Sequence, residues 1–109
     1  MPTCEDIRRI ALALPEAYEA PHFEATSFRV KTKIFCTLDP DQPRATLKFD
    51  PEDQRNLVAA YPHAVAPVDG YWGRNGWTIV DGSDLEPEIL ADLLRMSWAG
   101  VAPKRLLKP

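Results

Sequence analysis

The apolar positions at the start of the chain repeat with the period of a helix. They fall three or four residues apart, on one helical face: Ile7, Ile10, Ala11 and Leu14. Thr3 is a favourable N-cap residue, and Asp6 lies three residues further on, as in a capping box. Pro15 cannot continue a helix. The pattern therefore predicts a helix that opens after Thr3 and stops at Pro15.

Between Ala17 and Phe49 the period of the apolar positions becomes two. Alternate residues are apolar in short runs: Phe28 and Val30; Ile34, Cys36 and Leu38; Ala45, Leu47 and Phe49. This alternation is typical of half-buried strands in an antiparallel sheet. Lys31-Thr32 and the Asp39–Pro43 segment separate the runs, and their turn-forming residues predict hairpin connections.

A second helix and a further strand are predicted in the middle of the chain. Asp50 is a favourable cap, and Pro51 suits the first helical position, where no N–H donor is needed. Pro62 ends this helix. Asn75-Gly76 indicates a tight turn, and the next residues form a strand that carries Trp77, Ile79 and Val80.

A third helix is predicted near the end of the chain, opening at Ser83 or Asp84. Its apolar stripe is broad and consists of Leu85, Ile89, Leu90, Leu93, Leu94 and Trp98. Gly100 and Pro103 mark the end of this helix or a kink in it.

The order of these elements predicts an α+β fold. The loops between the strands are too short for parallel crossovers, so we expect a single-layer antiparallel sheet of about five strands, with three helices packed mainly on one face. A chain of this length is expected to form one domain over residues 1–109. The core is predicted to contain Ile7, Ile34, Cys36, Leu47, Trp77, Ile79, Leu90 and Leu93.

Composition and charge narrow the classes of function. Hydrophobic residues make up 45% of the chain, which argues against intrinsic disorder. The net charge of −3 counts against nucleic-acid binding unless the basic residues cluster on one face. No secretion signal or membrane-spanning apolar stretch is evident, so a cytoplasmic location without membrane attachment is expected.

The two cysteines, Cys4 and Cys36, do not have the spacing of a metal motif. Cys36 lies in an apolar run, which indicates a buried free thiol. A Cys4–Cys36 disulfide remains an alternative.

Several segments together resemble the MmcQ/YjbR family of small bacterial α+β domains. They are Leu14-Pro15-Glu16 followed by Glu19, His22 and Phe23; Ser27-Phe28-Arg29-Val30; Lys33-Ile34-Phe35; Gly76-Trp77 with Val80; and Ser97-Trp98 followed by Val101-Ala102-Pro103-Lys104. The resemblance implies a compact domain with an antiparallel sheet. Proteins of this family are often labelled DNA-binding, because their two β-hairpins can be likened to paired wings, so the resemblance implies DNA binding by analogy of fold. Thr32 stands where the family usually has glycine, which places the geometry of this hairpin turn in question.

A weak DNA-binding domain is the first functional hypothesis. Arg29, Lys31 and Lys33 fall within one hairpin, and Arg74 adds a fourth cation to the candidate nucleic-acid-binding set. Such charges on a two-stranded ribbon can contact a phosphate backbone. The alternative interpretation is that the charged hairpin only solvates one face of the sheet.

A small-molecule or peptide-binding module is the second hypothesis. Its site is the aromatic loop over residues 71–77, and its candidate ligand-binding residues are His22, Tyr71, Trp72 and Trp77. Aromatic side chains beside flexible glycines can line a ligand pocket. Trp72 is predicted to be at least partly exposed.

An enzyme of unknown type is the third hypothesis, and the sequence favours it least. His22 and His63 have no cysteine or carboxylate partners at metal-ligand spacing, so no metal is predicted. Cys36 lies among apolar neighbours, unlike an activated nucleophile. No cofactor-binding or catalytic motif is recognised, and no catalytic residue or cofactor is assigned.

Overall fold

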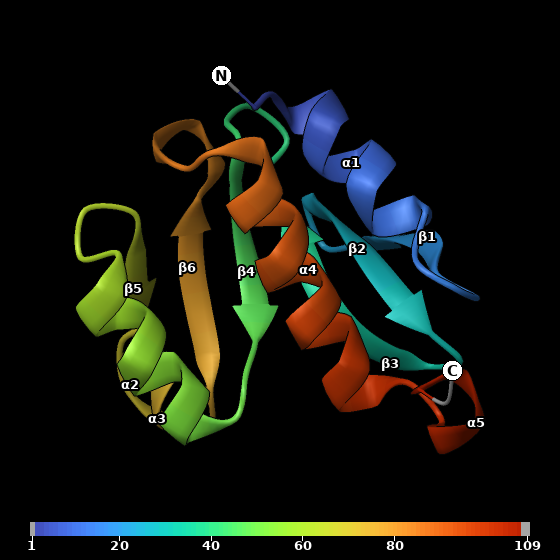
Figure 1. Ribbon diagram of the computed structural model, residues 1–109. Coiled ribbons are helices and arrows are strands. Elements are labelled where there is room, and N and C mark those ends of the chain that lie inside the picture. Colours follow the sequence, from blue (N-terminus) through green and yellow to red (C-terminus); the bar gives the residue numbers. More distant parts are fainter. Residues whose placement is uncertain (1, 108–109) are drawn as a thin grey trace.

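The computed structural model describes residues 2–107, and its centre is a six-stranded antiparallel sheet (Figure 1). The order of strands across the sheet is β1-β2-β3-β4-β6-β5. Their bounds are β1 Tyr18–His22, β2 Ala25–Val30, β3 Lys33–Leu38, β4 Arg44–Lys48, β5 Val65–Pro67 and β6 Trp77–Asp81. The first four strands are neighbours in sequence order, so hairpins connect them.

Three longer helices lie on one side of the sheet, in front of it in Figure 1. They are α1 Cys4–Leu12, α2 Pro51–Ala60 and α4 Pro87–Val101. The shorter elements are α3 Tyr71–Arg74, the 3-10 turn η1 Gly82–Asp84 and α5 Lys104–Leu107. The structure confirms the α+β class. The extra strand and the single-turn helices escaped prediction because they are too short to establish a period.

The helix starts predicted from capping residues are confirmed for two helices. The Thr3 side chain accepts from the Asp6 N–H, and Asp6 accepts from the Thr3 N–H, which completes the capping box. Asp50 accepts from the Glu52 N–H at the start of α2.

The start predicted for the third helix is wrong. Ser83 and Asp84 belong to η1, where the Asp81 carboxylate accepts from the Ser83 N–H. The long helix α4 begins at Pro87, because the fixed φ of proline suits the first helical position.

The core lies between the sheet and the long helices. Ile7, Cys36, Leu47, Leu90 and Leu93 are buried there, as predicted. Ile34, Trp77 and Ile79 are only half-buried, and their assignment to the core is wrong. On β6 the residues facing the core are Thr78 and Val80, both 0% exposed.

A β-bulge explains why Ile34 leaves the core. Phe28 pairs with Cys36, but the next residue, Arg29, pairs with Ile34, so Phe35 has no partner on β2. The extra residue lets Phe35 and Cys36 both point into the core, where each is fully buried. Ile34 then turns to the opposite face of the sheet.

Both cysteines are free thiols in the structure, which leaves the alternative of a disulfide unsupported. Burial raises the pKa of the Cys36 thiol well above its ordinary value. No helix among residues 2–107 is long and apolar enough to span a bilayer.

Candidate functional site

The sheet has a second face that the long helices do not cover. Residues paired across antiparallel strands point to the same face. One such row consists of Ser27, Thr37, Thr46 and Ile79, and it crosses β2, β3, β4 and β6. Trp77 lies on the same face, because it is two residues from Ile79 along β6.

A cavity of about 430 Å³ opens on this face. Its lining residues are His22, Ile34, Thr37, Thr46, Val68, Trp72 and Trp77. The two threonines come from adjacent central strands, where they pair with each other and form the floor. The side chains around them are mainly apolar. Three of the four candidate ligand-binding residues, His22, Trp72 and Trp77, therefore meet at one cavity.

A second cavity, of about 490 Å³, adjoins the first and shares His22, Thr37 and Thr46 with it. Its other lining residues are Phe23, Glu24, Ala25, Asp39, Pro40, Asp41 and Arg44. Because three residues line both cavities, we treat the two as one depression, the sheet groove. It extends from the aromatic loop at one end to the β1–β2 turn at the other.

Exposed aromatic side chains stand at both ends of the sheet groove. At one end Trp72 is 61% exposed, as predicted, and packs edge-on against Tyr71 with ring centroids 5.5 Å apart. Tyr71 itself does not line the cavity. At the other end Phe23 is 95% exposed and packs against His22 at 4.8 Å.

A buried glutamine positions the aromatic loop. The Nε2 group of Gln54, on α2, lies 3.0 Å from the Gly73 carbonyl oxygen, 3.1 Å from that of Trp77 and 2.9 Å from Thr78 Oγ1. Its two hydrogens are shared among these three acceptors. Gln54 therefore fixes the loop on both sides of Trp77.

The importance of Gln54 was missed in the sequence, although a signal for it exists. Gln54 lies three, four and seven residues before the apolar residues Leu57, Val58 and Tyr61. That is the buried side of an amphipathic helix, so a polar side chain at this position needs a hydrogen-bond partner.

The basic hairpin residues are placed differently from one another. Arg29 is half-buried, and its guanidinium donates to Ser27 Oγ at 2.9 Å and to the Pro21 carbonyl oxygen at 3.4 Å. Lys31 and Lys33 are exposed at the turn between β2 and β3. The positive φ of this turn, 57°, falls on Lys31, so Thr32 avoids the strain that its position suggested.

Arg74 lies apart from the basic hairpin. It is the last residue of α3, which leads into β6, whereas the hairpin joins β2 to β3. Three strand spacings separate β2 from β6, a distance of about 14 Å. The hairpin turn and α3 do share one end of the sheet, so a large ligand can reach both.

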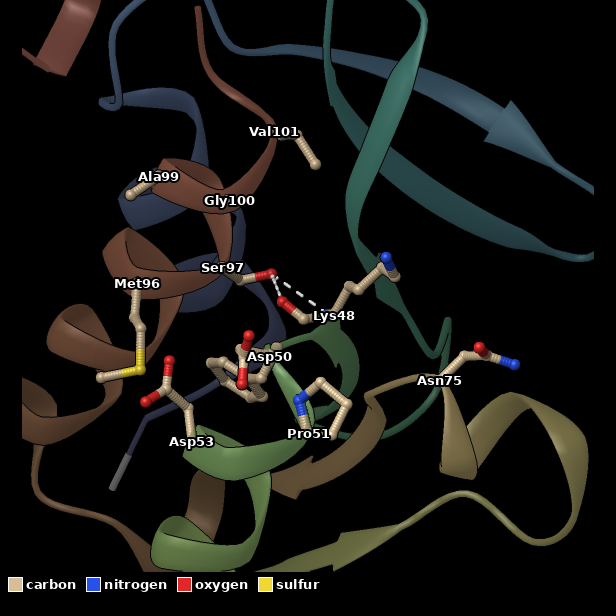
Figure 2. Close-up of a pocket in the computed structure, with 11 residues that line it drawn as sticks. Lys48, Asp50, Pro51, Asp53, Asn75, Met96, Ser97, Ala99, Gly100 and Val101 are labelled. Atoms are coloured by element: carbon tan, nitrogen blue, oxygen red, sulfur yellow. Dashed lines mark hydrogen bonds between the residues drawn. The ribbon is translucent and has the colours of Figure 1, made fainter. Parts of the chain in front are cut away.

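A further cavity, of about 520 Å³, lies on the helical side (Figure 2). Ser97 is part of its wall, and its hydroxyl oxygen accepts from the Lys48 N–H at 3.1 Å. The same oxygen is 2.6 Å from the Phe35 carbonyl and 2.7 Å from the Lys48 carbonyl, to either of which it can donate. These bonds join α4 to β3 and β4. The groups of Ser97 and Lys48 that dashed lines join in Figure 2 therefore stabilise the fold.

The first and last segments that carry the family resemblance meet in space. Trp98 Nε1 donates to the Pro15 carbonyl oxygen at 3.0 Å, and Arg105 forms an ion pair with Glu16 at 2.7 Å. These residues act in packing and lie outside the sheet groove.

Metal centres and activated thiols each require a particular arrangement of side chains. Among residues 2–107, no three His, Cys, Asp or Glu side chains gather as metal ligands would. The raised pKa keeps the Cys36 thiol protonated at neutral pH, and a protonated thiol is a poor nucleophile.

Comparison with known proteins agrees with this fold. The sequence model of the YjbR family matches residues 12–99. The crystal structure of the Deinococcus radiodurans protein DR2400, whose domain is described as DUF419, is similar with a TM-score of 0.79 and 29% sequence identity. The likeness covers 100% of this chain and 91% of that protein. No curated protein matches the chain.

Proposed function

The chain belongs to the YjbR family, and we propose that this member is a binding module whose site is the sheet groove. The observation that carries the proposal is the meeting of Trp72, Trp77 and His22 at one cavity. These residues come from α3, β6 and β1, and the fold has brought them together on the face that the long helices do not cover.

The groove has the properties of a ligand site. The cavity beside the aromatic loop, about 430 Å³, falls within the usual range for small-ligand pockets. Its lining is mainly apolar, and the Thr37 and Thr46 hydroxyls and the His22 imidazole supply a few polar groups. An indole that is 61% exposed contributes little to folding. Contact with a ligand would account for the exposed position of the Trp72 side chain.

The indole N–H signals in a ¹H–¹⁵N spectrum provide a direct test. Indole, added in increasing concentration, serves as the aromatic probe. The signals of Trp72 and Trp77 should shift and saturate. The signal of Trp98 should stay in place, because that side chain is fully buried and donates to Pro15. No shift at Trp72 and Trp77 up to about 10 mM indole, which corresponds to a binding free energy near −3 kcal/mol, would contradict the proposal.

A pair of arginine variants checks the location of binding. Thr46→Arg places a long side chain on the floor of the groove and should abolish the shifts. Ala59→Arg adds the same group to an exposed position on α2, on the helical side, and should leave them unchanged. Equal loss of binding in both variants would place the probe outside the groove.

Weak DNA binding is the second candidate function. It is favoured by one observation: Lys31 and Lys33 are exposed at the β2–β3 turn, at the same end of the sheet as Arg74. Three to five phosphate contacts would give a slope of log K against log salt of about −2.7 to −4.5 on duplex DNA.

Anisotropy titration with a mixed-sequence duplex at low salt tests this second candidate. Lys31→Gln combined with Lys33→Gln should abolish binding and leave the melting temperature nearly unchanged, because both side chains are exposed. Absence of binding at about 50 mM salt, where phosphate contacts are strong, would remove general duplex binding as a function.

A further inference from the structure

The far end of the sheet groove has an excess of negative charge. Three carboxylates line it, those of Glu24, Asp39 and Asp41, against the single guanidinium of Arg44. That guanidinium donates to the side chain of Gln42. Within the described part of the chain, none of the three carboxylates takes part in an ion pair. A cationic group on a ligand would complement this end.

Phe23 adds an apolar contact at the same end, and the fold does not explain it. It opens the two-residue turn between β1 and β2 with a φ of 56°, where glycine or asparagine is favoured. It is 95% exposed, so it packs little into the protein. Apart from its edge-on contact with His22, most of this phenylalanine is left open for contact with something outside the chain.

The dimensions of the groove favour an extended occupant. From Trp77 on β6 to Ala25 on β2 the groove crosses three strand spacings. Trp77 is in register with Lys48 and Ala25 lies level with Arg44, so these two ends are four residues apart along β4. The diagonal of the groove is therefore about 20 Å, the length of about six residues of extended chain. A ligand that fills only the aromatic end would not reach the carboxylates.

The chemistry of the floor suits a polypeptide backbone. Thr37 and Thr46 line both cavities, so their hydroxyls lie midway along the groove. Hydroxyls both donate and accept, as a peptide main chain requires. A phosphodiester chain on the same path would meet the three carboxylates, and like charges repel.

Resting on the proposed function, we infer that the sheet groove binds an extended peptide segment of a partner protein. An apolar side chain of the peptide lies against Trp72 and Trp77. About five residues away, near the spacing set by the length of the groove, a lysine or arginine of the peptide lies among Glu24, Asp39 and Asp41. Phe23 holds the peptide at that end, and His22, which lines both cavities, contacts it between the two ends.

Matched hexapeptides test this inference against the ¹⁵N-labelled protein. The termini of each peptide are blocked, so that they carry no charge. Each has phenylalanine at one end, four serines in the middle, and lysine, glutamine or glutamate at the other end. Both chain directions are made. In the favoured direction, the lysine peptide should bind about tenfold more tightly than the glutamate peptide, as expected for a few weak, exposed charge interactions. Salt should weaken the lysine peptide most.

Charge reversal in the protein provides the complementary test. Glu24→Lys combined with Asp41→Lys changes two exposed side chains and should reverse the preference, so that the glutamate peptide binds more tightly. Asp92→Lys, on the exposed side of α4, is the matched control and should retain the preference of the parent. Phe23→Ser should weaken all the peptides and leave indole binding at Trp72 unchanged.

The outcomes separate this inference from the proposed function. If indole binds and no hexapeptide does, the peptide is the wrong occupant, while the groove remains a binding site. If all the peptides bind equally, the acidic end does not select a cation and the inference is overturned. Tighter binding of a thymidine hexanucleotide than of the lysine peptide would also overturn it, in favour of single-stranded nucleic acid. If neither indole nor any peptide binds, both proposals fail.

Discussion

At the scale of single residues, the three tryptophans show how differently one residue type can be used. Trp98 is fully buried under the sheet and donates to the Pro15 carbonyl. Trp77 is half-buried on the open face, although the sequence pattern predicted it in the core. Trp72 is 61% exposed. Their contributions to stability should follow this order.

Alanine substitution of each tryptophan tests that order. Trp98→Ala should lower the unfolding free energy by about 3–5 kcal/mol, as for a packed aromatic in a core. Trp77→Ala should cost about 1–2 kcal/mol and Trp72→Ala less than about 1 kcal/mol, because less of each side chain leaves water on folding. Urea unfolding measures all three. Equal losses for Trp77→Ala and Trp98→Ala would mean that the open face is covered.

Cys36 gives stability a dependence on pH. Burial raises its pKa in the folded protein, whereas the unfolded thiol ionises near pH 8.5. The contribution of the buried, protonated thiol to the unfolding free energy is therefore fully present below about pH 8.5. That contribution decreases as pH rises from there towards the folded pKa, by up to about 1.4 kcal/mol per pH unit. Unfolding curves at pH 8 and 9.5 should show this loss for the parent and not for Cys36→Ala. An identical loss in both proteins would assign it to other groups.

At the scale of elements, Ser97 is the junction between α4 and the sheet. Its hydroxyl serves the Lys48 N–H and two carbonyl groups where β3 and β4 separate. Ser97→Ala leaves these buried groups short of partners, which should cost about 1–3 kcal/mol. Ser83→Ala is the control, because Asp81 still accepts from the Ser83 N–H after the hydroxyl is removed. A loss at Ser97 no greater than at Ser83 would contradict the assignment.

Two glycines should respond oppositely to alanine. Gly76 leads into β6 with a φ of 101°, and an added Cβ would lie 1.8 Å from the Phe49 carbonyl oxygen. Gly76→Ala should therefore cost more than about 2 kcal/mol. Gly100 lies in α4 with no atom within 4 Å of an added Cβ. Gly100→Ala should therefore raise the unfolding free energy by about 0.5–1 kcal/mol. Thermal unfolding distinguishes the two signs.

At the scale of the whole molecule, the sheet groove joins distant elements. Its lining comes from β1, β2, β3, β4, β6 and α3, so a ligand held there binds the assembled sheet and not the unfolded chain. A ligand present at a concentration of ten times its dissociation constant should raise the unfolding free energy by about 1.4 kcal/mol. For a chain of this size the melting temperature should then rise by about 5 °C or more. The Thr46→Arg variant should show no rise, and an equal rise there would place binding elsewhere.

The elements themselves were largely predictable from local signals. The capping box of Thr3 and the proline after Asp50 located two helix starts, because these residues act on backbone groups only a few positions away. The two-residue turn at Lys31 was also found. The start of α4 was missed, because Ser83 and Asp84 are residue types that often cap helices, but here they lie inside a short 3-10 turn that Asp81 caps.

The candidate site was predictable only in part. Tyr71, Trp72 and Trp77 are close in sequence, so an aromatic loop could be recognised, and the partial exposure of Trp72 is confirmed. His22 and the two indoles of Trp72 and Trp77 line one cavity although β1 and β6 are four strand spacings apart, and that proximity depends on how the strands are arranged in the sheet. The acidic end of the groove was not foreseen, because Glu24 and Asp41 belong to different turns.

The sequence by itself determined the class of elements, their approximate order and the residues that cap them, since those properties depend on neighbours along the chain. The tertiary structure alone decided which face of β6 is buried and where the facing of β3 changes. Alternation in β6 is equally consistent with Trp77 inside or outside. Gln54 on α2 donates to the inward-facing Thr78, and the indole is left on the open face. In β3 the bulge at Phe35 moves Ile34 to that face in the same way. Burial depends on what packs against a strand, and here those partners come from distant parts of the chain.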